Sequence, residues 1–133
     1  MKALAANITN GLQPESRIEV CDNSGAKEIK LFSIKGGKSV KGRRPGAGIG
    51  DMIMGAVTKG RPDMMKQVVF AIIVRQRRPY RRPDGTRVCF EGNAAVVLKD
   101  DKGTPKGTIL KGPVAKEACT RWPNVAKLAK IVV

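Results

Sequence analysis

An arginine-rich segment, RQRRPYRRPDG at residues 75–85, contains the residue types in this sequence that are best suited to a specific chemistry. It has five arginines within eight positions and no acidic residue before Asp84. Guanidinium groups stay charged, fork onto phosphate oxygens and stack on flat rings, so the segment predicts binding to a polyanion. Pro79 and Pro83 would stiffen the segment and reduce the entropy that it loses on binding.

Two further basic segments accompany the first. Residues 35–45, KGGKSVKGRRP, contain no acid, and their glycines and proline are typical of a loop. Lys59, Arg61 and Lys66 form a weaker cluster around Asp63. The chain has 26 Lys and Arg against 11 Asp and Glu, which leaves a net charge of +15. This excess favours nucleic acid over a membrane surface, for which no amphipathic anchor helix is visible.

No arrangement of residues suited to catalysis accompanies these cations. The sequence has no histidine, which removes histidine-based triads and the commonest general base near neutral pH. Residues 36–39, GGKS, resemble the end of a phosphate-binding loop, but Phe32 stands where that motif needs glycine. Residues 46–50, GAGIG, lack the dinucleotide-binding spacing, and Asp100-Asp101 is typical of a hairpin turn. We therefore predict a protein without enzymatic activity, cofactor or metal.

Short apolar stretches separate the basic segments, and we predict that they are strands. The strand expected over residues 67–75 contains VVFAIIV, an unbroken run typical of burial on both faces, and it would deliver the arginines that follow it. The other expected strands are residues 18–21, 26–34, 51–58, 87–90 and 94–99. A change of apolar parity within 26–34 indicates a bulge or a twist. Five or six strands at this spacing predict a mainly β protein built on a small closed barrel.

The C-terminal residues 112–133 predict two short helices lying against the barrel. Gly112-Pro113 would begin the first helix, and Trp122, because it precedes Pro123, would end it. A second helix would start at Asn124. Its apolar side would consist of Val125, Leu128, Ala129 and Val132.

The length of 133 residues suits one domain, with residues 1–111 as the barrel and its basic loops and 112–133 as the helical segment. No apolar stretch is long enough to span a membrane, and the first residues do not resemble a secretion signal, so we expect a cytoplasmic protein. Three cysteines at wide spacing are expected to be reduced thiols at or near the core: Cys21, Cys89 and Cys119.

Trp122 and Val125 have two possible roles. We predict that they form an apolar anchor for a protein partner, because charge is balanced in this part of the chain. They could equally pack on the barrel, and the sequence leaves both possibilities open.

RNA recognised through its backbone and shape fits these residues better than other nucleic acids. Tyr80 is the only aromatic residue in a basic segment, which disfavours a protein that stacks one base after another. No predicted helix carries the cations, which disfavours a recognition helix in the DNA major groove. The predicted RNA contacts, with Tyr80 packing on a base or sugar, are Lys38, Lys41, Arg43, Arg44, Lys59, Arg75, Arg77, Arg78, Tyr80, Arg81 and Arg82.

The chain also resembles a known family over nearly its whole length. Residues 71–74, AIIV, are followed at set spacings by Asp84-Gly85, Phe90, Asn93 and Val96-Val97. This pattern is similar to the signature of the large-subunit ribosomal protein family numbered fourteen in the universal series. Further matches in order and spacing are residues 20–27, VCDNSGAK, residues 50–51, GD, and residues 106–115, KGTILKGPVA.

Several features resemble the archaeal and eukaryotic branch of that family more than the bacterial one. They are the N-terminal extension through Gln13, the run of residues 77–82 and Trp122-Pro123. Gly92 departs from the pattern, since the family usually has an acid there.

The resemblance implies a five-stranded barrel with a projecting hairpin and C-terminal helices, on the subunit-interface side of the large ribosomal subunit. It implies contacts with large-subunit ribosomal RNA, with ribosomal protein three and with the protein called twenty-four e. It further implies intersubunit bridges to small-subunit RNA, and docking of the anti-association initiation factor six on the C-terminal part.

A free-standing nucleic-acid chaperone or barrel-type single-strand binder is the rival reading of the residues. Such a protein would exchange between many RNAs, whereas a ribosomal component would remain with one particle. An enzyme acting on RNA ranks behind both, because no set of acid, base or metal ligands is visible.

Overall fold

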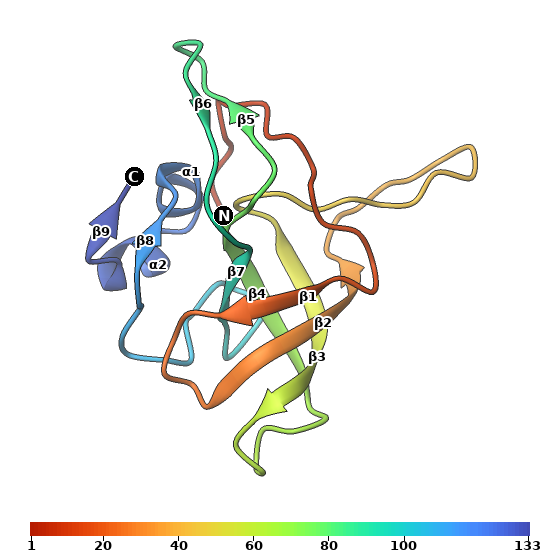
Figure 1. Ribbon diagram of the computed structural model, residues 1–133, viewed down its shortest axis with the longest axis vertical. Coiled ribbons are helices and arrows are strands. Elements are labelled where there is room, and N and C mark those ends of the chain that lie inside the picture. Colours follow the sequence, from red (N-terminus) through yellow and green to blue (C-terminus); the bar gives the residue numbers. More distant parts are fainter.

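A closed barrel of five strands forms the centre of the computed structural model, which describes residues 1–133 (Figure 1). Around the barrel the strands follow the order β1 (Arg17–Val20), β2 (Ala26–Ile34), β3 (Met52–Gly60), β4 (Val68–Arg75) and β7 (Ala94–Val97). All neighbours are antiparallel except β1 and β7, whose parallel pairing closes the barrel. The mainly β fold and the five-stranded closed barrel are confirmed.

Strand β4 has the burial that its apolar run predicts. Residues 71–74 are fully buried, because one face of the strand lines the barrel core and the other is covered by the C-terminal part of the chain. The backbone N–H of Ala115 donates to the carbonyl of Val74 across this contact, at 3.1 Å. Strand β7 is buried on both faces as well. These two strands therefore hold the arginine-rich segment, which leaves the end of β4, on a rigid base.

Strand β2 is irregular, as its change of apolar parity indicates. Its pairing with β3 shifts register at three places along the strand, including one between Leu31 and Ser33. The expected bulge is therefore confirmed. Beyond Ile34 the chain leaves the barrel in a long loop, residues 35–51, that projects sideways before β3 begins (Figure 1).

The expected strand over residues 87–90 is not part of the barrel. Only β6 (Arg87–Val88) is extended there, and it pairs antiparallel with β5 (Tyr80–Arg81) in a separate two-stranded hairpin. This hairpin rises above the barrel, beside the N-terminal segment (Figure 1). A projecting hairpin is present, and the sixth candidate strand belongs to it.

The C-terminal segment contains two short helices and an additional strand pair. Helix α1 covers Lys116–Arg121 and α2 covers Pro123–Leu128, so the expected boundary at Trp122 is confirmed. Strands β8 (Pro113–Val114) and β9 (Ile131–Val132) pair in parallel. Neither helix has the length and apolar character that a membrane span requires.

Two expectations for this segment were wrong. The first helix begins at Lys116 and not at Gly112-Pro113, because the backbone at Pro113–Val114 is extended and pairs with β9. Val132 lies in β9 and not on the second helix, which ends where Ala129 turns to an extended conformation. The β-branched residues at 131–133 favour that extended state.

Candidate nucleic-acid interface

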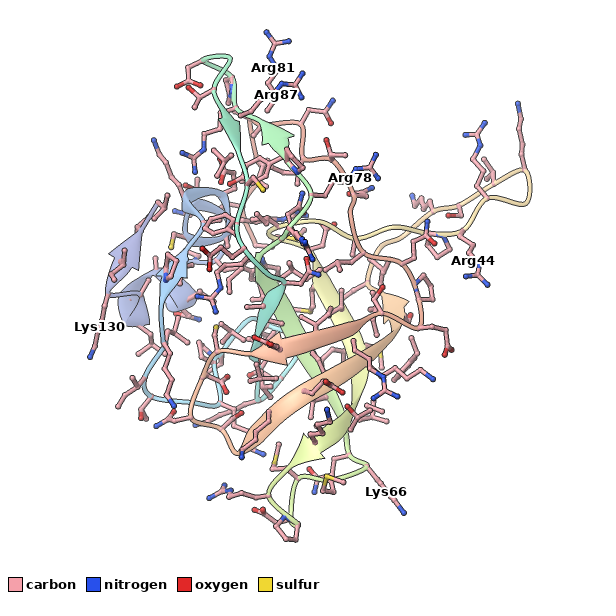
Figure 2. The ribbon with its side chains drawn as sticks, in the orientation of Figure 1. Arg44, Lys66, Arg78, Arg81, Arg87 and Lys130 are labelled. Carbon is pink, nitrogen blue, oxygen red and sulfur yellow. The ribbon has the colours of Figure 1, made fainter.

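The long loop between β2 and β3 carries four of the predicted contact residues into solvent. Lys38, Lys41, Arg43 and Arg44 are all exposed, and none of them belongs to an ion pair. Lys41 and the next glycine have left-handed backbone conformations, φ 60° and 72°, which turn the chain at the far end of the loop. Arg44 points away from the barrel in Figure 2. The loop therefore presents unpartnered cations on an extended arm.

The β5–β6 hairpin is the second cationic projection. Arg77, Arg78 and Arg81 are exposed on it or on its approach. Arg81 lies directly opposite Arg87 in the strand pairing, and both point outward in Figure 2. Like charges at paired positions destabilise a hairpin, so this pair fits a site where an anion binds between them.

Arg87 was missed in the sequence, although a signal for it was available. Asp84-Gly85 is a typical hairpin turn dipeptide, and it implies that Arg87 lies on the strand that returns beside Arg81 and Arg82. The loop has three residues, 83–85, which sets Arg87 opposite Arg81. In the structure the Asp84 carboxylate accepts a hydrogen bond from the Thr86 backbone N–H at 2.9 Å. This bond is the main reason why the pKa of Asp84 is lowered. It also stabilises the turn.

Two other predicted contact residues have partners within the chain. Lys59 is exposed and forms an ion pair with Glu28 at 3.5 Å. Arg75 is half-buried, and its guanidinium donates to the carbonyls of Lys111 and Pro113 at 3.3 and 3.1 Å. The Lys59 side chain remains accessible at 67% exposure, whereas Arg75 mainly ties β4 to the chain that leads into α1.

A buried network joins the hairpin to helix α1. The Tyr80 hydroxyl and the Arg82 Nε each donate to the Glu117 carboxylate at 2.8 Å. A second Arg82 nitrogen donates to the carbonyl oxygen of Val133 at 2.6 Å. Burial by itself would raise the pKa of Glu117, but the hydrogen bonds from Arg82 and Tyr80 outweigh it and lower the pKa. Glu117 is therefore a buried anion matched by one arginine.

The structure assigns Tyr80 and Arg82 to this network. The Tyr80 ring is fully buried and has no free face, so the expected packing on a base or sugar does not occur in this conformation. Burial also raises the pKa of the Tyr80 hydroxyl, and Glu117 adds to the effect. The Arg82 side chain is 19% exposed and is already paired, which leaves it little capacity for RNA.

Trp122 and Val125 pack against the body of the protein. Both side chains are buried, and the Trp122 indole N–H donates to the Gly50 carbonyl at 2.7 Å. The ring lies against Gly103, where a Cβ atom would stand 2.6 Å from a ring carbon. Of the two roles that the sequence left open, the structure favours packing on the barrel.

No cluster of three or more histidine, cysteine or acidic side chains is placed to hold a metal ion. The cysteines are free thiols, with Cys21 buried, Cys119 half-buried and Cys89 exposed. Cys89 therefore departs from the expected position at or near the core.

Comparison with known proteins agrees with these features. The family model described as "Ribosomal protein L14p/L23e" matches residues 11–133. The chain is 50% identical over 133 residues to the large ribosomal subunit protein uL14 of Nanoarchaeum equitans, and 51% identical to that of Haloarcula marismortui, with complete coverage of both chains. It is 50% identical to uL14 of Methanococcus maripaludis over 132 residues, 99% of each chain. The resemblance noted in the sequence is confirmed, and the chain belongs to the ribosomal protein L14p/L23e family.

Proposed function

We propose that this protein is a structural constituent of the large ribosomal subunit that binds large-subunit ribosomal RNA through its two cationic projections. Its relatives carry the name large ribosomal subunit protein, and the family is one of ribosomal structural proteins and not of enzymes. The observation that carries the RNA-binding role is the set of exposed cations without acidic partners on the β2–β3 loop and the β5–β6 hairpin.

The two projections would neutralise phosphates while the barrel holds their positions. Arg43 and Arg44 on the loop, with Lys38 and Lys41, would lie along one stretch of RNA backbone. On the hairpin, Arg77, Arg78 and Arg81 would bind a second stretch, and Arg87 joins them as the cross-strand neighbour of Arg81. Because the hairpin is fixed to α1 through Glu117, its backbone loses little conformational freedom on binding.

The proposal includes a place at the subunit interface, in the cytoplasm. There the protein would contribute to intersubunit bridges with small-subunit RNA and contact ribosomal protein three and protein twenty-four e. The C-terminal part would dock the anti-association initiation factor six. Since Trp122 and Val125 are buried, the exposed Ile131, Val132 and Val133 offer the apolar surface for a protein partner there.

The test is a triple variant of the hairpin, Arg77→Ala, Arg78→Ala and Arg81→Ala. Arg82 is left intact because it stabilises the fold through Glu117. A tagged chain is expressed in its native cell, and the lysate is sedimented through sucrose at moderate and high salt. We expect the wild-type chain to stay in the large-subunit peak and the variant to leave it. Loss of three phosphate contacts should reduce the slope of log K against log salt by about 2 to 3.

A matched control removes equal charge elsewhere, by Lys99→Ala, Lys116→Ala and Lys127→Ala. All three lysines are exposed and lie outside both projections, so this control should sediment like the wild type. A hairpin variant that is folded by circular dichroism and remains in the particle would remove the hairpin from the RNA interface. A wild-type chain spread over many RNAs would favour the mobile RNA-binding protein instead.

A further inference from the structure

A cleft of about 1300 Å³ lies between the N-terminal segment and the β2–β3 loop. Its walls are residues 1–10 on one side and residues 34–51 on the other, with the turn at Asp101-Lys102 and the end of α1 completing it. The N-terminal wall is fixed at both ends. The Lys2 N–H donates to the Arg121 carbonyl at 3.0 Å, and Leu12 exchanges backbone hydrogen bonds with Ala47 at 3.0 and 2.7 Å. The cleft is therefore a bounded channel and not a gap between loose segments.

The cleft is strongly cationic. Its lining has two acids, and each is already paired: Asp51 with Arg121 at 3.3 Å and Asp101 with Lys35 at 3.4 Å. Five further cations of the lining belong to no ion pair, namely Lys2, Lys38, Arg43, Arg44 and Lys102. Three of these five, Lys2, Arg43 and Lys102, come from three separate parts of the chain. The occupant must supply the missing negative charge.

Polar groups of the backbone add donors to the same channel. The N–H groups of Lys38, Ser39 and Val40 make no hydrogen bond within the protein. Gly36 has open space where a side chain would stand, so the loop backbone is accessible at that point. Lysine side chains and free backbone N–H groups together suit phosphate oxygens.

The volume and lining favour the backbone of a polymer strand over a small molecule. The volume exceeds the roughly 300–1,000 Å³ that encloses a drug-sized ligand. Trp122, the only aromatic residue of the lining, is buried and donates to Gly50, so no ring is free to stack on successive bases. Half-buried Leu4, Ile8 and Ile34 supply apolar contacts for sugar faces between the phosphate positions.

We propose that this cleft holds a single strand of RNA by its backbone, with the N-terminal segment as one wall and the β2–β3 loop as the other. The proposal rests on the proposed RNA-binding function and adds to it. It adds Lys2 and Lys102, which lie outside both projections. It also assigns single-stranded RNA to the side of the β2–β3 loop that faces the N-terminal segment. The hairpin is free to bind a different part of the RNA.

The test compares three full-length chains with the wild type for equilibrium binding to purified large-subunit ribosomal RNA across a range of salt concentrations. The cleft variant is Lys2→Ala, Lys38→Ala and Lys102→Ala, which touches no ion pair and no side-chain packing. The hairpin variant and the matched control at Lys99, Lys116 and Lys127 are those described above. Each phosphate contact with a single strand contributes about 0.7 to the slope of log K against log salt.

We expect the slope of log K against log salt to be smaller in magnitude by about 2 for the cleft variant than for the wild type. If the two chains bind equally at 1 M salt, the variant then binds about 100-fold more weakly at 0.1 M. The control should keep the wild-type slope. Photo-crosslinking of the assembled subunit should also give nucleotide adducts on peptides from residues 1–10 and 35–44.

The outcomes separate the two proposals. If the hairpin variant is weakened and the cleft variant binds like the control, the cleft inference is overturned and the proposed function stands. If the wild-type chain itself does not bind the RNA, the proposed function fails first. Crosslinks from both walls to an acidic protein segment, with no nucleotide adduct, would assign the cleft to a protein and overturn the proposal.

Discussion

Replacing Glu117 by glutamine should show how much the buried network stabilises the fold. Glu117 is 6% exposed, and its carboxylate accepts hydrogen bonds from Tyr80 and Arg82. Glutamine keeps the shape, can accept from Arg82 and can donate to the Tyr80 oxygen, so the change removes mainly the charge. A hydrogen bond to a charged group contributes about 1.5–3 kcal/mol and a neutral one about 0.5–1.5, so the Tyr80 bond, which becomes neutral, loses about 1 kcal/mol. Arg82 keeps its charge but loses its counter-ion, which removes about 1 kcal/mol more, so the loss is about 2 kcal/mol in all. For a domain of this size the loss lowers Tm by about 8 °C.

The same substitution has a defined pH dependence. The pKa of Glu117 is lowered in the folded protein, so the folded state binds fewer protons than the unfolded state just below the ordinary value of 4.5. Its contribution to stability is therefore fully present above that value and is lost as pH falls through the lowered pKa. The glutamine variant has no such contribution. The free energies of unfolding of the two chains should differ most at neutral pH and converge in acid.

Urea unfolding of both chains from neutral pH to about pH 3 measures this difference. Glu91→Gln is the control, because Glu91 is exposed and belongs to no ion pair, and it should change stability by less than about 0.5 kcal/mol. A Glu117→Gln chain as stable as this control at neutral pH, or a gap that stays constant down to about pH 3, would refute the account of the network. A double-mutant cycle with Tyr80→Phe should show coupling between the two sites.

Three further predictions concern the core and the thiols. Trp122→Ala should lower the free energy of unfolding in urea by about 3–5 kcal/mol, because it removes a buried ring that packs on Gly103. A loss below about 1 kcal/mol would contradict this packing. Gly103→Ala should lower the free energy of unfolding by more than about 2 kcal/mol, because Gly103 has φ +94° and a Cβ there would meet the Trp122 ring. The control Gly92→Ala should be nearly neutral, because a Cβ at Gly92 would meet open space. With a thiol reagent at neutral pH, the exposed Cys89 should react first and Cys21 should stay unmodified in the native chain. The reason is that Cys21 is buried, which raises the pKa of its thiol to about 11. Rapid loss of the Cys21 thiol would show that this part of the barrel opens.

The elements that were predicted correctly are those whose evidence is local. The apolar run of β4 and the parity change in β2 are visible within nine residues, and both were found in the structure as expected. The break between the helices follows from the steric effect of Pro123 on Trp122. Local patterns of this kind fixed the strands, and the strands in turn required a barrel.

The features that were missed depend on partners far along the chain. Tyr80 is surrounded by arginines and was expected to be exposed, yet its hydroxyl meets a carboxylate 37 positions away. Strand β8 has only two residues and exists because β9 returns to pair with it. Among the predicted contact residues, Arg75 and Arg82 differ from Arg77 and Arg78 only through such distant partners. Composition cannot distinguish a cation that holds the fold from one that is free to bind.

The parallel pairing of β1 and β7 has a consequence for how the protein is made. It joins residues 19–20 to residues 94–95. During synthesis β1 therefore leaves the ribosome first, and one of its edges has no hydrogen-bonding partner until β7 has been made. Folds dominated by such distant pairings have high contact order and close in milliseconds to seconds. Until then the nascent chain exposes open strand edges beside dense positive charge, a state prone to misplaced pairing and to premature attachment to RNA. A cell that makes this protein in quantity should therefore need a partner that shields the charge while the barrel closes.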